Sequence, residues 1–389
     1  MKINHPEIVR QGGAVQYQFP VQCSDGSEVL TYSLKEPYSE LVSELCDAAL
    51  VALLIPAMTQ GEDIHIAGTI SEKLFYNASG PLQHVLKVII PKLHLIKVYP
   101  DDVQVDCQRA SGVATGFSGG IDSFSVLADH FYGQVPKGYR VTHLLYNNVG
   151  SHLAGQERLF RERYQRLTAL VRQLELPFVA VNSNLDIFYK GYSFLTTHTP
   201  RNASVALLLQ QGIGRFLYAS AYPYSDTFIR PIEAISHSDP VILPLLSTER
   251  LDAILVGAEY TRVEKTIRVS QLKDSYQVLD VCVDDKRAGN CSVCEKCMRT
   301  MLTLEMLGVL DRYTGVFDLE AYWRRRDNFI LFMLRNQQNS MYREIMNFAR
   351  ECRFQFPLSV RIQSLYPDPA YKVKRAFEIL HQKASAMLR

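Results

Sequence analysis

The sequence predicts an α/β fold in which a parallel sheet is covered by helices on both faces. Of the 389 residues, 47% are hydrophobic and 21% are charged, which is typical of a globular protein with a sizeable core. From about residue 111, short apolar runs alternate with helical patterns, the order typical of βαβ units. A Ser-Gly-Gly turn follows the first apolar run, and ligands of parallel sheets bind beyond such strand ends.

The elements of this sheet are expected in a fixed order along the chain. Apolar runs predict strands at 113–117, 141–147, 178–182 and 215–221. Helical spacing predicts helices at 121–131, 153–174 and 202–211 between them. The apolar run at 241–246 resembles a further strand. Strands that alternate with helices in this way favour a parallel sheet.

Two further regions flank this central part. Residues 1–110 predict an N-terminal α+β accessory domain with period-two strands at 14–19 and 29–34 and a helix at 39–58. The run at 83–90 fits either a helix or a strand. The central domain is expected at 111–308, and residues 309–389 predict a helical C-terminal region.

Charge and hydropathy exclude several function classes. The net charge is +2, which does not favour nucleic acid or a membrane surface as a partner. The basic clusters at 324–326 and 372–375 favour solvated helix faces. The most apolar stretch, 48–58, is too short to cross about 30 Å of hydrocarbon. The first residues lack the apolar run of a signal peptide, so the expected location is the cytoplasm.

The stretch Val113–Ser123 predicts an anion site. Two glycines after the strand, Gly119 and Gly120, allow a tight turn and a close approach to a ligand. The helix that follows offers free N–H groups and a favourable dipole. Asp122 itself repels phosphate, so its carboxylate fits a helix cap, a magnesium ligand or both. The alternative is an ordinary Ser/Gly turn before a capped helix.

Four of the eight cysteines fall in one 16-residue window with the spacing C-x8-C-x2-C-x2-C. They are Cys282, Cys291, Cys294 and Cys297. Four thiolates match tetrahedral Zn²⁺ with no position left for water. An iron–sulfur cluster, buried free thiols or a redox pair are the alternatives. The other four, at 23, 46, 107 and 352, are scattered, unlike a secreted disulfide scaffold.

The string SGGIDS resembles the SGGxDS signature of the PP-loop ATP pyrophosphatases. The resemblance implies a Rossmann-like fold of the adenine nucleotide alpha hydrolase type, with MgATP bound at the loop. Such enzymes cleave ATP between the α and β phosphates and transfer AMP to a substrate oxygen. Asp122 then has a metal or positioning role. Asn147, at the end of the second predicted strand, fits either the adenosine pocket or an ordinary loop between strand and helix. Phosphate binding is implied for Ser118, Gly119, Gly120 and Ser123.

Together with the cysteine spacing, residues 112–308 are similar to 7-cyano-7-deazaguanine synthases. That similarity implies a structural zinc and activation of a carboxylate by ATP, followed by attack of ammonia. Those enzymes usually have a Lys-containing helix start after the run that corresponds to 241–246, where this chain has Ser-Thr-Glu-Arg. The cation at the α-phosphate is therefore expected from Arg262, Lys265 or Arg268, and Lys265 and Arg262 are the predicted catalytic cations. The alternative for 262–265 is an ordinary exposed helix, which its acid–base spacing also fits.

The function expected from these motifs is an ATP-dependent, AMP-forming C–N ligase. Its partners would be a small molecule, peptide or protein that bears a carboxylate, and ammonia or an amine. A second copy of this chain, in a homodimer, is a further possible partner. The alternatives are a tRNA-modifying PP-loop enzyme, which the near-neutral charge does not favour, and a non-catalytic module that binds ATP and zinc.

Four further polar residues are weaker candidates. His198 and Arg201 precede the predicted helix at 202–211, where Arg201 fits either a bidentate phosphate or carboxylate contact or a surface helix start. His237 and Asp239 precede the run at 241–246, and Asp239 fits either a metal or substrate ligand or an ordinary Ser-Asp-Pro turn.

Overall fold

The computed structural model describes residues 1–105, 108–152, 156–282, 284 and 286–366. The chain divides into two compact units, Met1–Asn290 and Cys291–Arg389. The predictions for Cys107, for the basic cluster at 372–375 and for the helix start at 153–155 lie outside the described residues. Across the described ranges, no helix is both long and apolar enough to cross a membrane.

The first unit is built on one mixed sheet, which has eleven strands within the described residues. Its strand order is β11-β10-β7-β8-β9-β4-β3-β1-β5-β6, and β2 also pairs with β3. The strands are β1 (Lys2–Ile3), β2 (Glu7–Gln11), β3 (Ala14–Cys23), β4 (Gly26–Lys35), β5 (Ile64–Ser71), β6 (Val98–Gln104), β7 (Gly112–Gly116), β8 (His143–Asn148), β9 (Phe178–Ser183), β10 (Ile213–Ala219) and β11 (Asp252–Val256).

The five strands from β7 to β11 are parallel to one another. Counted along the chain from β7, their order across the sheet is 5-4-1-2-3. The predicted α/β class is therefore confirmed, and the arrangement is compatible with a Rossmann-like fold. The direction of strand addition reverses between β7 and β10, and ligands of such sheets bind at the carboxyl ends of the strands at this reversal.

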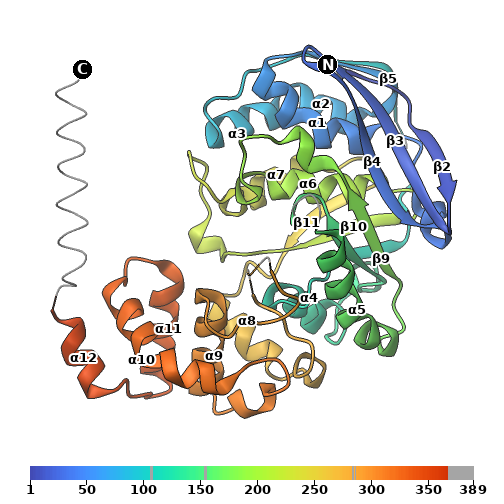
Figure 1. Ribbon diagram of the computed structural model, residues 1–389. Helices are drawn as coiled ribbons and strands as arrows, with labels where there is room; N and C mark the ends of the chain where they lie inside the picture. Colours follow the sequence, from blue (N-terminus) through green and yellow to red (C-terminus); the bar gives the residue numbers. More distant parts are fainter. Residues whose placement is uncertain (106–107, 153–155, 283, 285, 367–389) are drawn as a thin grey trace, which may run out of the picture. The chain divides into compact units, whose positions relative to one another are not determined.

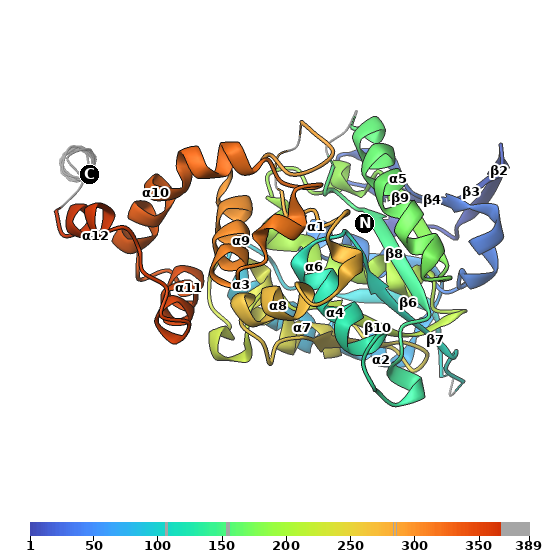
Figure 2. The same cartoon turned by 90° about the horizontal axis from the view of Figure 1, so that it is seen from below.

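The N-terminal strands continue the same sheet. β4 pairs antiparallel with β9, and β3 pairs antiparallel with β4 along its whole length. The predicted strands at 14–19 and 29–34 are confirmed, whereas β5 and β6 were not predicted. β6 contains Pro100 and two aspartates, residue types that are depleted in strands. Figures 1 and 2 show β2, β3 and β4 as blue strands at one end of the unit.

Helices cover both faces of the sheet. α4 packs against α8 on one face, while α1, α6 and α7 pack on the other, as the two views show (Figures 1 and 2). The helices of the first unit are α1 (Asp47–Gln60), α2 (Glu72–Ser79), α3 (Pro81–Ile89), α4 (Ile121–His130), α5 (Glu157–Gln173), α6 (Phe194–Leu208), α7 (Asp239–Leu245) and α8 (Arg262–Val269).

The structure corrects three predicted elements. Residues 241–245 lie in α7, a helix that Leu246 caps; the prediction of a strand failed because a short apolar run does not distinguish the two types. The predicted helix at 39–58 is a 3₁₀ helix, Glu36–Leu41, followed by α1. α6 begins at Phe194, eight residues before the predicted start at 202, and contains Pro200.

α1 is buried on almost every side from Asp47 to Met58, as expected for a helix that is apolar all round. Asp47 is fully buried and accepts three hydrogen bonds. Its Oδ1 accepts from the Ser71 N–H (2.8 Å), and its Oδ2 accepts from the Ser71 hydroxyl (2.5 Å) and the Gln210 amide (2.7 Å). This carboxylate therefore ties α1 to β5 and to the turn before β10.

The described part of the second unit is helical. Its helices are α9 (Glu295–Met306), α10 (Leu319–Arg335), α11 (Ser340–Glu351) and α12 (Leu358–Ser364), drawn in orange and red in Figure 1. Arg326 of α10 forms a fork of hydrogen bonds to the Glu305 carboxylate of α9. Arg324 and Arg325 are exposed.

Candidate functional site

The Ser-Gly-Gly turn joins β7 to α4 at the reversal point of the sheet. Gly119 has a φ of +78°, a conformation that glycine adopts without strain. A Cβ atom here would lie 2.8 Å from Leu167 Cδ2 and 3.3 Å from the Val278 carbonyl. The Gly119 carbonyl accepts a hydrogen bond from the Asp280 N–H (2.8 Å), so segment 278–280 fixes the turn.

The turn leaves backbone donors unused. Among the residues that the structure describes, the N–H groups of Gly119, Gly120 and Ile121 donate to no protein acceptor. Ser118 is exposed, whereas Ser123 is buried and its hydroxyl donates to the Gly120 carbonyl (2.9 Å). Free N–H groups at the start of a helix are suited to binding an anion.

Asp122 meets both predicted cations. Its Oδ2 lies 2.8 Å from Arg262 Nη1, and its Oδ1 lies 3.3 Å from Lys265 Nζ. Asp122 comes from the first turn of α4, and both cations come from α8. The structure thus brings together the three residues predicted as catalytic, although they are about 140 positions apart in the sequence.

Lys265 is only 1% exposed. Its ammonium group also donates to the Ser220 carbonyl, at 2.5 Å, just beyond the end of β10. Burial lowers the pKa of Lys265, and the Asp122 carboxylate opposes that change. A capping box fixes the start of α8: the Thr261 hydroxyl accepts from the Glu264 N–H, and Glu264 accepts from the Thr261 N–H.

Arg268, the third candidate cation, lies elsewhere. It pairs with Asp129 and stacks on the Tyr260 ring at 4.4 Å. Asp129 is seven residues after Asp122 on the same face of α4. α8 therefore places cations against α4 at two positions. Arg262 and Lys265 pair with Asp122 at the turn, and Arg268 pairs with Asp129 away from it.

A polar cluster lies at the carboxyl ends of β8 and β10, beneath α6. Asn147 Nδ2 donates to Asn202 Oδ1 (3.2 Å), and the His198 Nδ1 lies 2.7 Å from the Tyr218 hydroxyl. The Asn202 Nδ2 donates to the His198 carbonyl (2.9 Å), and the Thr199 hydroxyl contacts the His198 Nδ1 at 3.4 Å. Burial raises the pKa of Tyr218, with further contributions from Asp239 and Asp122. Asn147 therefore contacts α6 rather than the cations of α8.

Asp239 completes this cluster from the first turn of α7. It is fully buried, and its Oδ1 accepts a hydrogen bond from the Thr199 hydroxyl at 2.6 Å. Burial raises the pKa of Asp239 to about 7, and the Thr199 bond opposes this rise. Its Oδ2 and the Asn147 Oδ1 are shielded from water and have no hydrogen-bond partner in the described structure.

Arg201 is not at a surface helix start. It is fully buried in α6, where it pairs with Asp186 at 2.8 Å and donates to the Val149 carbonyl at 3.2 Å. The Tyr189 ring lies 3.7 Å from its guanidinium. The backbone at Gly150 passes so close to this guanidinium that a Cβ would clash with it.

His237 lies between two aromatic rings. The centroids of Tyr222 and Phe228 are 3.7 and 4.5 Å from its ring, with interplanar angles of 22° and 20°. Its Nδ1 contacts the Asp226 carbonyl at 2.8 Å. The stack connects three loop segments that follow β10.

The four clustered cysteines can hold a metal ion. Each of Cys282, Cys291, Cys294 and Cys297 offers one sulfur, and the four sulfur atoms lie within 4.8 Å of one another. The Sγ atoms of Cys291 and Cys297 are 3.9 Å apart, and the Cys294 N–H donates to the Cys291 sulfur at 3.2 Å. Tetrahedral Zn–S bonds of about 2.3 Å separate sulfur atoms by about 3.8 Å.

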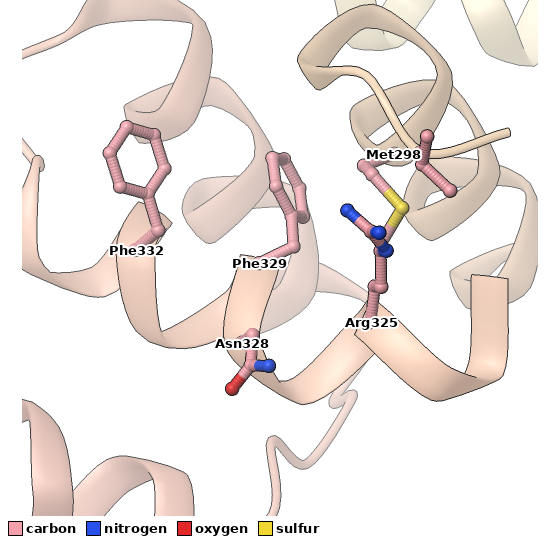
Figure 3. Close-up of a pocket in the computed structure, with 6 residues that line it drawn as sticks. Met298, Arg325, Asn328, Phe329 and Phe332 are labelled. Atoms are coloured by element: carbon pink, nitrogen blue, oxygen red, sulfur yellow. The ribbon is translucent and has the colours of Figure 1, made fainter. Parts of the chain in front are cut away.

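The second unit contains a pocket of about 290 Å³ beside this motif. Figure 3 shows Phe329 and Phe332 of α10 on one side and Met298 of α9 on the other. Met298 directly follows the last cysteine, and Val293, which also lines the pocket, directly precedes Cys294. A metal that orders the cysteine turn would therefore also fix one wall of this pocket.

Sequence reasoning did not identify several residues around the turn. Tyr218 stands at the end of β10, a position that could have drawn attention. Thr199, Ser220 and Asp280 carry no such signal, because tertiary packing alone brings them to the site.

Comparisons of this chain with models of known protein families, with curated proteins and with solved structures found no match in any of the three.

Proposed function

We propose that this protein is an ATP-dependent, AMP-forming ligase that joins a carboxylate to ammonia or an amine. The observation that carries the proposal is the grouping of Asp122, Arg262 and Lys265 beside a glycine turn with unused N–H donors. This grouping lies where the strand order reverses, the place at which parallel sheets bind nucleotides.

Each group has a role in the proposed reaction. The N–H groups of the turn bind the β and γ phosphates of ATP. A carboxylate oxygen of the substrate attacks the α-phosphorus, and the bond from this phosphorus to the bridging oxygen breaks, so that pyrophosphate leaves. Arg262 and Lys265 stabilise the charge that develops there. The amine then attacks the acyl carbon, loses a proton and displaces AMP.

The residues at the turn also fit a magnesium ion. Asp122 is a partly exposed carboxylate, with 29% of its side chain accessible, and carboxylate oxygens are ligands that Mg²⁺ prefers. When bound, Mg²⁺ neutralises charge on the leaving pyrophosphate. Asp122 would hold the ion, and the two cations would turn from Asp122 to the phosphates.

An exchange of Asp122 tests this proposal. Asp122→Asn should lower the formation of AMP and pyrophosphate by more than about 100-fold, because both the magnesium ligand and the anchor of the two cations change. The assay uses ATP, Mg²⁺, ammonium and a filtered cell extract as the source of carboxylates. Asp129→Asn is the matched control on the same face of α4 and should keep the wild-type rate.

Two outcomes would contradict the proposal. One is wild-type turnover in Asp122→Asn under these conditions. The other is tight binding of ATP by the wild type with no pyrophosphate from any extract, which would favour the non-catalytic module. RNA that is modified in the extract would instead favour the tRNA-modifying alternative.

We further infer that the cysteine cluster holds a structural zinc ion. Four sulfur ligands at these separations fill a tetrahedral site and leave no position for water or substrate. Cys291→Ser should reduce zinc from about one atom per chain and lower the melting temperature at the same time. Cys352→Ser changes a cysteine outside the cluster and should change neither.

Metal analysis and absorption spectroscopy separate the alternatives. Unchanged zinc content in Cys291→Ser would exclude the four-ligand assignment. Iron with inorganic sulfide and a visible absorption band in the wild type would identify an iron–sulfur cluster instead.

A further inference from the structure

The polar cluster beneath α6 has a feature that packing alone does not explain. Two of its atoms, Asp239 Oδ2 and Asn147 Oδ1, are shielded from water and have no hydrogen-bond partner within the described residues. Both atoms are acceptors. A buried acceptor without a donor is unfavourable, because its lost hydration is not replaced, and a buried charge without partners is more so.

The geometry points to a binding site for an ammonium ion or a primary ammonium group in this cluster, with Asp239 as its anionic ligand. We propose that this site receives the amine that the ligase proposed above would join to the carboxylate. The inference rests on the proposed function for its role in catalysis, but the binding itself does not depend on that function.

The chemistry of the cluster favours this class of ligand. An ammonium group carries a positive charge and several N–H donors, and the two unpartnered atoms are a carboxylate oxygen and an amide oxygen. A divalent metal would require more oxygen ligands than one carboxylate and one amide provide.

The contacts within the cluster connect the two atoms. Asn147 donates to Asn202, and Asn202 donates to the His198 carbonyl at 2.9 Å. The Thr199 hydroxyl contacts His198 Nδ1 at 3.4 Å and donates to Asp239. Both unpartnered acceptors therefore belong to one network.

The same network adjoins the phosphate-binding turn. Tyr218 of β10, which contacts His198 of the cluster, is two residues before Ser220, and the Ser220 carbonyl accepts a hydrogen bond from Lys265. The end of β10 therefore connects the proposed amine site to the residues that would activate the carboxylate. An amine held there would be close to the acyl carbon that it attacks.

The first experiment locates the site directly. Crystals of the full chain are soaked in Tl⁺, an ion that substitutes for ammonium and scatters anomalously. We expect an anomalous peak in contact with Asp239 Oδ2, and in the absence of Tl⁺ a water molecule or no density. Peaks confined to the surface, with none at Asp239, would overturn the proposal, and no variant is required for this result.

The second experiment measures binding in solution at pH 8. Ammonium chloride should raise the melting temperature of the wild type more than tetramethylammonium chloride at equal concentration, because the latter has the charge but no N–H donors. Asp239→Asn should abolish this difference, and Asp226→Asn, an exchange outside the cluster, should keep it. Equal effects of the two salts on the wild type would overturn the proposal.

Neither experiment uses ATP or a carboxylate. Ammonium binding without any pyrophosphate formation would refute the ligase and keep the site. Pyrophosphate formation without ammonium binding at Asp239 would refute the site and keep the ligase.

Discussion

Asp47 and Asp239 are both fully buried aspartates in the first unit, but their surroundings differ. Asp47, in α1, accepts three hydrogen bonds, from the N–H and hydroxyl of Ser71 and from the Gln210 amide. Asp239, in α7, accepts one, from Thr199, and its second oxygen has no partner in the described structure. Burial raises the pKa of both carboxyls, and around Asp47 more donors oppose the rise.

The difference distinguishes a structural carboxylate from one that is available to a ligand. Charged groups are seldom buried without donors, because the loss of hydration is not compensated. Asp47 is compensated by the protein itself. Asp239 is not, and it lies at the carboxyl edge of the sheet, where parallel sheets bind ligands. Each experiment below changes one side of this comparison.

At pH 5, the largest effect of a single exchange is expected at Asp47. Asp47→Asn replaces one acceptor oxygen by an NH₂ group that faces a donor, so the free energy of unfolding should fall by about 3 kcal/mol. Asp239→Asn, the matched exchange, should change it by less than about 1 kcal/mol at pH 5, where Asp239 is protonated. Urea denaturation of both variants measures the two values. Equal losses of unfolding free energy in the two variants would contradict the distinction between a structural carboxylate and one available to a ligand.

The ionisation of Asp239 is expected to make the free energy of unfolding depend on pH. The change for each pH unit is smaller than the loss in Asp47→Asn, but it adds up over several units. An unfolded aspartate ionises near pH 4, whereas folded Asp239 keeps its proton up to about pH 7. The folded state therefore binds more protons in this range, and the wild type loses stability as the pH rises. Relative to Asp239→Asn, the loss should be about 1.4 kcal/mol for each unit between pH 4 and 7.

Other titrating groups cancel in this difference. Burial and Arg163 lower the pKa of His152 to about 4, so His152 destabilises both proteins equally below pH 6.5. The groups that face Asp239 are Thr199 and Tyr218, with His198 next to Tyr218, and they are present in both. A wild-type curve parallel to that of Asp239→Asn would show that Asp239 does not hold its proton.

The sequence predicted four of the five parallel strands, β7 to β10, because these strands and the helices between them have clear and different periods. It missed β11 and placed a strand-like run at 241–246 instead. It did not predict β5 or β6, or that both lie in the same sheet as β7. Strand β6 contains Pro100, and pairing of distant strands is decided by tertiary contacts. The run at 241–246, most of which lies in helix α7, was taken for a strand, since six apolar residues carry no reliable period.

The candidate site was predictable where a local motif carries it. The turn and the four cysteines are continuous patterns in the sequence, whereas the contact of Asp122 with Lys265 joins two helices that are far apart in the chain. The sequence suggested Asp239 as a ligand or a turn residue. Its unpartnered oxygen follows from the packing of α6 against α7, which no local pattern encodes.

The smallest effect is expected from the single donor to Asp239. Thr199→Val removes the hydroxyl that stabilises the ionised carboxylate and keeps the shape of the side chain. A hydrogen bond to a charged group is worth about 1.5–3 kcal/mol, so the pKa of Asp239 should rise by about one unit or slightly more. The pH at which the stability difference from Asp239→Asn levels off should move upward by the same amount.

Thr197→Val is the control for this exchange. Thr197 is equally buried in α6, but its hydroxyl donates to the Ser193 carbonyl and not to a carboxylate. The control should shift the free energy of unfolding by about 1 kcal/mol at every pH and leave the levelling point in place. If the free energy of unfolding of both valine variants ran parallel to that of the wild type at every pH, the Thr199 hydroxyl would not stabilise the charge of Asp239. Movement of the levelling point in Thr199→Val alone would show that one hydrogen bond keeps this carboxylate able to ionise near neutral pH, which a ligand with a positive charge requires.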